Sequence, residues 1–236
     1  MDMDDEDKKS AFNEVDILST LNHPNIIRYI ESFKDEDSLQ IVMEYADGGN
    51  LAQLINLKKH KNDVFTEIGI LDIISQISAA LSYMHSKRIL HRDLKTANVF
   101  IGMNGTIKLG DFGISKMLNT KSQAHTVIGT PYYLSPEMCE CNDYNAKSDI
   151  WALGCILYEL ASLKKPFSAQ NLPVLVQKIT ACEYDNIPQF YSTDLSCLVN
   201  IILQKNPANR PSANEIYDVL IPKIQEKVMD NDQNQR

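Results

Sequence analysis

The sequence lacks several features that would assign it to a specialised class of protein. Its 236 residues contain no apolar run long enough to cross a bilayer, and its first residues are acidic, whereas a secretion signal begins with basic residues. The five cysteines are odd in number and lack the paired spacing of a zinc site. They therefore favour reduced thiols over a disulfide or metal framework. These absences predict a soluble, intracellular protein.

Positive charge is also scarce. The chain has 23 lysines and arginines against 31 aspartates and glutamates, which gives a net charge of −8. A general nucleic-acid binder needs a basic surface, so this balance argues against that class. The apolar fraction of 44% and the charged fraction of 23% are those of an ordinary globular protein. The length is sufficient for one large domain or two lobes with a hydrophobic core.

Two short motifs carry the chemistry. Residues 91–98 read HRDLKTAN and residues 111–113 read DFG, with a strand-turn-strand pattern between them. These stretches match the H-R-D-L-x-x-x-N and D-F-G motifs of protein kinases. Phosphoryl transfer requires an aimed hydroxyl and neutralised charge more than it requires covalent chemistry. An aspartate that accepts a proton, an asparagine and a second aspartate that hold Mg²⁺, and a nearby lysine can supply both.

Apolar spacing and turn residues predict the secondary structure. The stretch 150–160 is apolar nearly all round, so its helix should be buried. We expect residues 111–137 to form a long loop and residues 229–236 to form a frayed polar tail. The predicted helices are 10–22, 50–59, 66–87, 150–160, 171–181, 193–205 and 212–222, and the predicted strands are 26–33, 39–45, 99–101 and 106–109.

The sequence resembles the NimA-related (NEK) serine/threonine protein kinases. The resemblance rests on residues 91–98, on Gly110 before the D-F-G motif and on the stretch VIGTPYYLSPE at 127–137. It extends from about Lys8 to Ile221. It implies an α+β, protein-kinase-like bilobal fold. The parts would be an acidic/basic segment at 1–9, a partial N-lobe at 10–46 (the C helix and a two-strand ribbon), an intact, mostly helical C-lobe at 47–222 and a polar tail at 223–236.

The resemblance also implies roles for the residues of the two motifs. Asp93 would be the catalytic base, and Lys95 would contact the transferring phosphate. Thr130 would lie beside both of them and help to select serine or threonine acceptors. Asn98 and Asp111 would ligate Mg²⁺, so the implied cofactors are ATP and Mg²⁺.

Further residues would bind the nucleotide or hold the site together. Met43 would be the gatekeeper beside the adenine, Glu44 and Ala46 would offer it backbone hydrogen bonds, Asn50 would lie near the ribose and Phe100 would form the floor. The resemblance also implies structural or regulatory roles. Glu14 would be the partner of an ATP-positioning lysine, Arg92 would face a phosphate on Thr126, and Phe112 and Gly113 would belong to the D-F-G motif. Glu137 and Arg210 would form a buried ion pair, and Asp149 would brace the catalytic loop.

One part of the family pattern is missing from these 236 residues. The thirteen residues before Glu14 contain no G-x-G-x-x-G and no V-A-I-K-like strand. The sequence therefore predicts an N-terminally truncated kinase domain whose transfer of the γ-phosphoryl group to protein Ser/Thr hydroxyls is impaired. The alternative is a catalytically silent kinase-like fragment that acts as a binding or scaffold module.

The resemblance finally implies partners and a location. The partners would be protein substrates with Ser/Thr acceptors, together with kinase or chaperone partners, and neither nucleic acid nor membrane. The location would be cytoplasmic, with association with the cytoskeleton, centrosome or cilium, and a role in the cell cycle.

Overall fold

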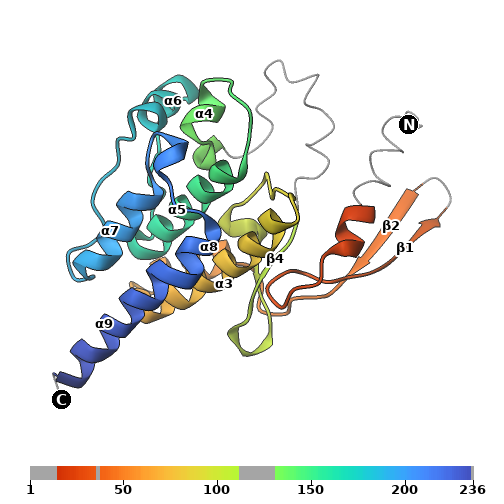
Figure 1. Ribbon diagram of the computed structural model, residues 1–236, viewed down its shortest axis with the longest axis horizontal. Coiled ribbons are helices and arrows are strands. Elements are labelled where there is room, and N and C mark those ends of the chain that lie inside the picture. Colours follow the sequence, from red (N-terminus) through yellow and green to blue (C-terminus); the bar gives the residue numbers. More distant parts are fainter. Residues whose placement is uncertain (1–14, 36–37, 112–130, 235–236) are drawn as a thin grey trace.

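The computed structural model describes residues 15–35, 38–111 and 131–234. A small part and a larger, mostly helical part lie side by side (Figure 1). The small part consists of a helix at residues 15–20 and an antiparallel ribbon of β1 (Tyr29–Asp35) and β2 (Ser38–Met43). This arrangement confirms the predicted α+β architecture, with its reduced strand region and a larger helical lobe.

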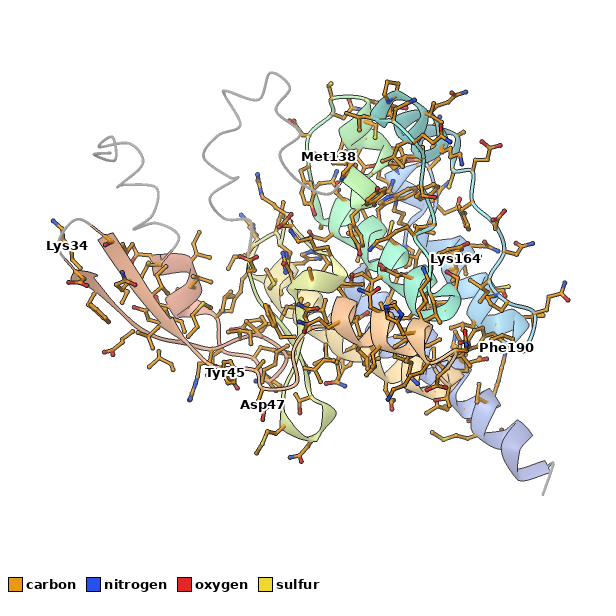
Figure 2. The ribbon with its side chains drawn as sticks, turned by 180° about the vertical axis from the view of Figure 1, so that it is seen from behind. Lys34, Tyr45, Asp47, Met138, Lys164 and Phe190 are labelled. Carbon is orange, nitrogen blue, oxygen red and sulfur yellow. The ribbon has the colours of Figure 1, made fainter. Side chains whose placement is uncertain are left out.

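The ribbon joins the helical part through one short stretch of backbone. Ile26 is 1% exposed and forms a parallel bridge with Leu109. The N–H of Ile27 donates to the Leu109 carbonyl at 2.8 Å, and the N–H of Leu109 donates to the Asn25 carbonyl at 2.9 Å. Lys34 marks the far tip of the ribbon, whereas Tyr45 lies where the chain leaves it for the helical part (Figure 2). The ribbon is therefore fastened at one end.

The larger part is built around a buried central helix, α5 (Ala146–Ser162), which packs against α3 (Glu67–Ser86) and α7 (Thr193–Ile202). Every residue of α5 from Ser148 to Ala161 is buried, which confirms the burial predicted for 150–160. The remaining helices of this part are α2 (Leu51–His60), α4 (Pro136–Cys139), α6 (Leu172–Ala181), α8 (Ala213–Glu215) and α9 (Ile221–Asn234), with a π-helical turn, η6 (Ile216–Leu220), between the last two.

A β-hairpin carries the chain between the two sequence motifs. Strands β3 (Val99–Ile101) and β4 (Ile107–Leu109) pair antiparallel across the predicted turn, where Asn104 takes a left-handed φ of 63°. Gly110 follows β4, and a Cβ there would lie 2.9 Å from the Ile27 side chain and 3.0 Å from the Phe100 ring. Glycine is needed because the backbone passes so close to these two side chains.

Two predictions about irregular segments were wrong. The stretch 111–137 is not a loop throughout, since η4 (Pro131–Tyr133) is helical and α4 begins at Pro136. The stretch 229–236 is not a frayed tail as far as the structure describes it, because α9 continues to Asn234. Ile221 and Ile224 are buried one turn apart on α9, which packs along α3, and their burial holds the helix in place (Figure 1).

Within the described residues, the structure has no helix that is both long and apolar enough to span a membrane.

Candidate active site

The HRDLKTAN segment lies between α3 and β3 and ends in one 3₁₀ turn, η1 (Thr96–Asn98). The turn folds the segment back so that Asp93, Lys95 and Asn98 meet. The Lys95 ammonium lies 2.7 Å from the Asp93 carboxylate, and each of these two side chains is about one quarter exposed. A carboxylate and an ammonium group that stay open to solvent on one short loop can both reach a substrate.

Asn98 ties this loop to the residue that opens the second motif. Its amide nitrogen donates to the Asp93 carbonyl at 2.8 Å, to the Asp93 carboxylate at 3.0 Å and to the Asp111 carbonyl at 3.3 Å. The Asn98 side chain is buried, whereas Asp111 is exposed. These three hydrogen bonds all use the Asn98 nitrogen, so the amide oxygen of Asn98 and the carboxylate of Asp111 could serve as oxygen ligands for a cation.

Two of the eight non-glycine residues with a positive φ in the described ranges lie in the two motifs. Arg92 has a φ of 65° and Asp111 a φ of 52°, both in the left-handed region that residues with a side chain rarely adopt. Such conformations persist where the surrounding contacts determine them, and they gather at functional sites.

Asp149, at the start of α5, supplies those contacts for the beginning of the loop. Its carboxylate accepts the backbone N–H groups of His91 at 3.0 Å and Arg92 at 3.1 Å. His85 on α3 lies 2.8 Å from the same carboxylate, and the hydroxyl of Tyr144 donates to it. Burial of Asp149 tends to raise its pKa, but these hydrogen bonds and the neighbouring histidines outweigh burial and lower the pKa. The carboxylate therefore stays ionised and keeps accepting.

The residues expected around the nucleotide lie on the path from the ribbon to α2 and β3. Met43 ends β2 and is half-buried against the core. The backbone N–H of Glu44 donates to the Arg28 carbonyl at 2.8 Å, so a nucleotide contact at this residue would use its carbonyl. Ala46 is half-buried. The roles of these three residues stay predictions.

Asn50 and Phe100 are neighbours, joined by an antiparallel bridge. The Asn50 side chain caps α2 by accepting a hydrogen bond from the Gln53 N–H at 3.0 Å. The side-chain oxygen of Gln53 in turn accepts a hydrogen bond from the Asn50 N–H. Asn50 thus has a structural task of its own, and its contact with a ribose stays a prediction.

Glu137 on α4 and Arg210 form a buried, two-pronged ion pair, with both nitrogen–oxygen distances at 2.8 Å. The hydroxyl of Ser148 on α5 adds a third hydrogen bond to Glu137 at 2.7 Å. Burial tends to raise the pKa of Glu137, but the bonds from Arg210 and Ser148 prevail and lower it. The pair fastens α4 to the chain that follows α7.

Five predicted site residues lie outside the described part of the chain, and their roles stay predictions: Glu14, Phe112, Gly113, Thr126 and Thr130.

Sequence reasoning missed several residues that hold the catalytic loop. One of them is His85, whose ring nitrogen lies 2.8 Å from the Asp149 carboxylate. Glu159 and Lys165 meet at the hydroxyl of Tyr133, which contacts Thr96 inside the loop. No local pattern marks these residues, because the contacts of His85 with Asp149, of Tyr133 with Thr96 and of Tyr133 with Glu159 join positions 26 to 64 residues apart.

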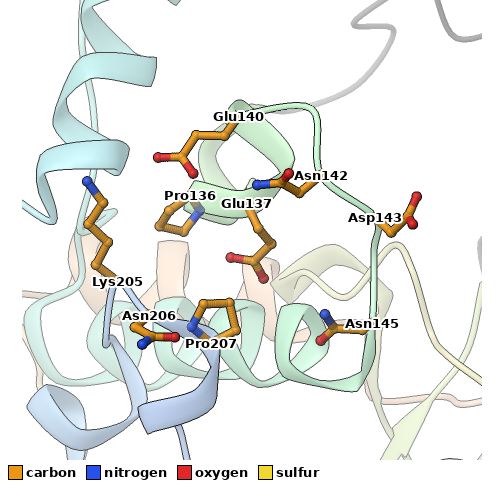
Figure 3. A pocket seen from close by; sticks show the side chains of 9 residues that line it. All are labelled: Pro136, Glu137, Glu140, Asn142, Asp143, Asn145, Lys205, Asn206 and Pro207. Carbon is orange, nitrogen blue, oxygen red and sulfur yellow. The ribbon is translucent and has the colours of Figure 1, made fainter.

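A cavity of about 430 Å³ opens beside the Glu137–Arg210 pair (Figure 3). Of the residues to which the sequence assigned a role, only Glu137 lines it. No group of three or more metal-binding side chains of the histidine, cysteine, aspartate or glutamate type occurs in the described ranges. The cavity is lined by Pro136, Glu137, Glu140, Asn142, Asp143, Asn145, Lys205, Asn206 and Pro207.

Comparison with known proteins places these features in context. Residues 1–219 match the family described as "Protein kinase domain". The chain is 48% identical over 217 residues to the serine/threonine-protein kinase Nek1 of Mus musculus and 51% identical over 212 residues to Nek8 of Danio rerio. It is 45% identical over 220 residues to the serine/threonine-protein kinase nekl-2 of Caenorhabditis elegans. These matches cover 92%, 89% and 91% of this chain but 18%, 30% and 62% of the relatives, so the chain spans less than two thirds of each.

Proposed function

Because the chain belongs to the protein kinase family, and within it to the NimA-related serine/threonine kinases, we propose that it transfers the γ-phosphoryl group of MgATP to serine and threonine hydroxyls of proteins. The observation that supports this best is the cluster of Asp93, Lys95 and Asn98 on one short loop, with Asp111 within hydrogen-bond distance of Asn98. A scaffold without catalytic demand has no physical need for these four together.

Asp93 and Lys95 would act on the two reacting partners. The Asp93 carboxylate would accept the proton of the acceptor hydroxyl and aim its oxygen at the phosphate. The Lys95 ammonium would stabilise the charge that develops on the transferring group. Their separation of 2.7 Å supports these roles, because it would bring the hydroxyl and the phosphoryl group to the same point.

Asn98 and Asp111 fit a magnesium ion by the chemistry of their donors. Mg²⁺ prefers hard oxygen ligands and is commonly held by one or two protein groups plus the phosphates of the substrate. The Asn98 amide oxygen and the exposed Asp111 carboxylate would provide such a pair, and the Asn98 nitrogen bonds the backbone carbonyl of Asp111. When bound, the ion would neutralise phosphate charge; the protein's part would be to supply these two oxygens.

The nucleotide itself would lie between the ribbon and the hairpin. We propose that Met43, Glu44 and Ala46 border the adenine, that Phe100 supports it from below and that Asn50 approaches the ribose. The close approach of the Gly110 backbone to the Phe100 ring supports this role of Phe100, because it limits the movement of the ring. Protein substrates follow from the family, whereas cytoskeletal, centrosomal or ciliary association rests on the resemblance alone.

The absence of G-x-G-x-x-G and of a V-A-I-K-like strand from these 236 residues supports a second candidate for a polypeptide of this extent. Without a phosphate-covering loop, the chain would bind kinase partners or substrates and transfer phosphate slowly or not at all. In that case the same surfaces would serve recognition alone.

A kinase assay separates the two candidates. We expect the 236-residue chain to label casein with the terminal phosphate of ATP and the Asp93→Asn variant to label it at least about 100-fold more slowly. Equal labelling by both would refute catalysis by this polypeptide. The assay should be repeated on a chain extended by the translated upstream DNA, because an in-frame glycine-rich strand there would restore the expected loop.

A further inference from the structure

Four polar groups converge on the phenol oxygen of Tyr133, which ends η4. The oxygen lies 2.9 Å from Oγ1 of Thr96 and 2.7 Å from Oε2 of Glu159, and Nζ of Lys165 also donates to it. The fourth group is the backbone N–H of Thr96, at 3.3 Å. Thr96 and Glu159 are buried, and the Lys165 side chain is about one quarter exposed. The cluster joins three separate stretches of the chain.

The donors and acceptors of this cluster fit in one consistent way. A tyrosine hydroxyl has one proton, which Tyr133 donates to the Glu159 carboxylate. Its oxygen then accepts from the Thr96 hydroxyl and from Lys165, and the Thr96 N–H shares the same oxygen at the longer distance of 3.3 Å. The ammonium of Lys165 also lies 2.6 Å from Glu159, so the buried carboxylate is paired. Burial, together with the Glu159 charge, raises the pKa of Tyr133, which keeps its proton in place.

This cluster fixes the middle of the catalytic loop. Thr96 begins the turn η1, and the residue before it, Lys95, makes no side-chain capping bond to that turn. The first N–H of the turn, that of Thr96, instead donates to the Tyr133 hydroxyl. Glu159 belongs to the buried helix α5, so the contact runs from the rigid core of the protein to the residue between Lys95 and Asn98.

We propose that the Tyr133 hydroxyl, backed by Glu159 and Lys165, positions the catalytic loop through Thr96. These are positioning residues, because they act through Lys95 and Asn98 and not on the reacting atoms. The catalytic consequence rests on the proposed kinase function, whereas the mechanical one does not. Because Tyr133 belongs to η4, its hydroxyl also connects η4 to the loop at which phosphate would be transferred.

Amide hydrogen exchange, measured by NMR on the whole chain, tests the mechanical part without any kinase activity. In Tyr133→Phe, which removes only the hydroxyl, we expect the amide protons of Thr96 and Asn98 to exchange about tenfold faster than in the wild type. The matched control is Tyr191→Phe, because that hydroxyl is also buried and bonded, to the Phe65 carbonyl at 2.8 Å, but lies outside the cluster. Exchange at both amides within twofold of the wild type in Tyr133→Phe would overturn the proposal.

A second pair of variants guards against misfolding of Tyr133→Phe. Thr96→Val keeps the shape of threonine without the hydroxyl, and Thr96→Ser keeps the hydroxyl. We expect Asn98 to exchange faster in Thr96→Val and to recover in Thr96→Ser. Equal exchange in the two variants would contradict the role of the hydroxyl.

Kinetics then test the catalytic consequence. We expect kcat to fall about tenfold to a hundredfold in Thr96→Val and Tyr133→Phe, with KM for ATP within twofold of the wild type and with Thr96→Ser near wild type. A change in KM alone, or an unchanged kcat, would contradict positioning of the loop. If the wild-type chain transfers no phosphate, the proposed function fails, and the exchange data still decide whether Tyr133 holds the loop.

Discussion

Replacing Arg210 should be among the most damaging single changes in this protein. Its guanidinium has five N–H donors, and the structure gives each of them an acceptor. Two bonds go to the Glu137 carboxylate at 2.8 Å, and the other three go to the backbone carbonyls of Gln204, Lys147 and Lys205 at 2.7, 2.8 and 3.1 Å. The side chain is 1% exposed, and its charge lies 4.9 Å from the centre of the Trp151 ring.

Arg210→Met keeps the apolar stem and removes all five donors. Glu137 would then be a buried carboxylate without its charge partner, and three backbone carbonyls would lose a donor. Removing one partner of a buried ion pair costs about 3–5 kcal/mol of unfolding free energy. We expect a loss at the upper end of this range, because the three carbonyls lose a donor as well.

Urea unfolding, followed by far-UV circular dichroism at pH 7, measures this loss. The control is Lys227→Met, because Lys227 and Asp194 form an ion pair at 2.7 Å whose side chains are 61% and 38% exposed. An exposed pair contributes less than about 1 kcal/mol. If Arg210→Met destabilised the chain by no more than Lys227→Met, the reasoning from burial and donor counting would be refuted.

The same pair predicts a pH dependence. The pKa of Glu137 is lowered in the folded state, so its contribution to stability is complete above the ordinary glutamate pKa and is lost as the pH falls through the folded pKa. Stability should therefore fall below about pH 4 in the wild type. Glu137→Gln should be less stable than the wild type at neutral pH. Its free energy of unfolding should also decrease less as the pH falls, because the variant has no carboxylate at this position to protonate.

Three further predictions address the loop, the hairpin and the last helix. Asp149→Asn should lower kcat about 10- to 100-fold with the fold intact by circular dichroism, because an amide cannot accept both backbone N–H groups of His91 and Arg92. Gly110→Ala should destabilise the chain by about 1–3 kcal/mol in urea unfolding, since the new methyl group would meet side-chain carbons at 2.9 and 3.0 Å. Ile224→Ala should cost about 2 kcal/mol by the same measurement if α9 packs as described, and a change below about 0.5 kcal/mol would contradict this packing.

The elements that the sequence predicted well are those whose pattern is local. Helix α3 repeats apolar residues on one face, and α5 is apolar all round, so their existence and burial followed from periodicity. The hairpin followed from the Asn-Gly turn. Helix α9 was misjudged beyond residue 222 because its sequence becomes polar there. The contacts that stabilise it come from α3 and α7: Gln225 donates to Asp72 at 3.0 Å, and Lys227 pairs with Asp194.

For the site, the sequence supplied the residues of the two motifs but not what holds them. Asp93, Lys95 and Asn98 stand within six positions of one another, so their meeting was predictable from one loop. Tyr133 and Thr96 are 37 residues apart, and neither carries a mark of its partner. Contacts of that kind depend on tertiary packing, which no period or spacing encodes.

Helix α5 explains why a site made of short, strained segments can keep its shape. Ser148 and Asp149 in its first turns reach Glu137 and the start of the catalytic loop, and Glu159 near its other end reaches the middle of that loop through Tyr133. Ten residues of α-helix separate Asp149 from Glu159, about 15 Å at 1.5 Å per residue. Because the helix is buried on every side, it cannot shorten or bend without opening the core. The loop is thus held at two points whose separation is set by one buried helix, and disturbing either point should displace the loop while the other stays in place.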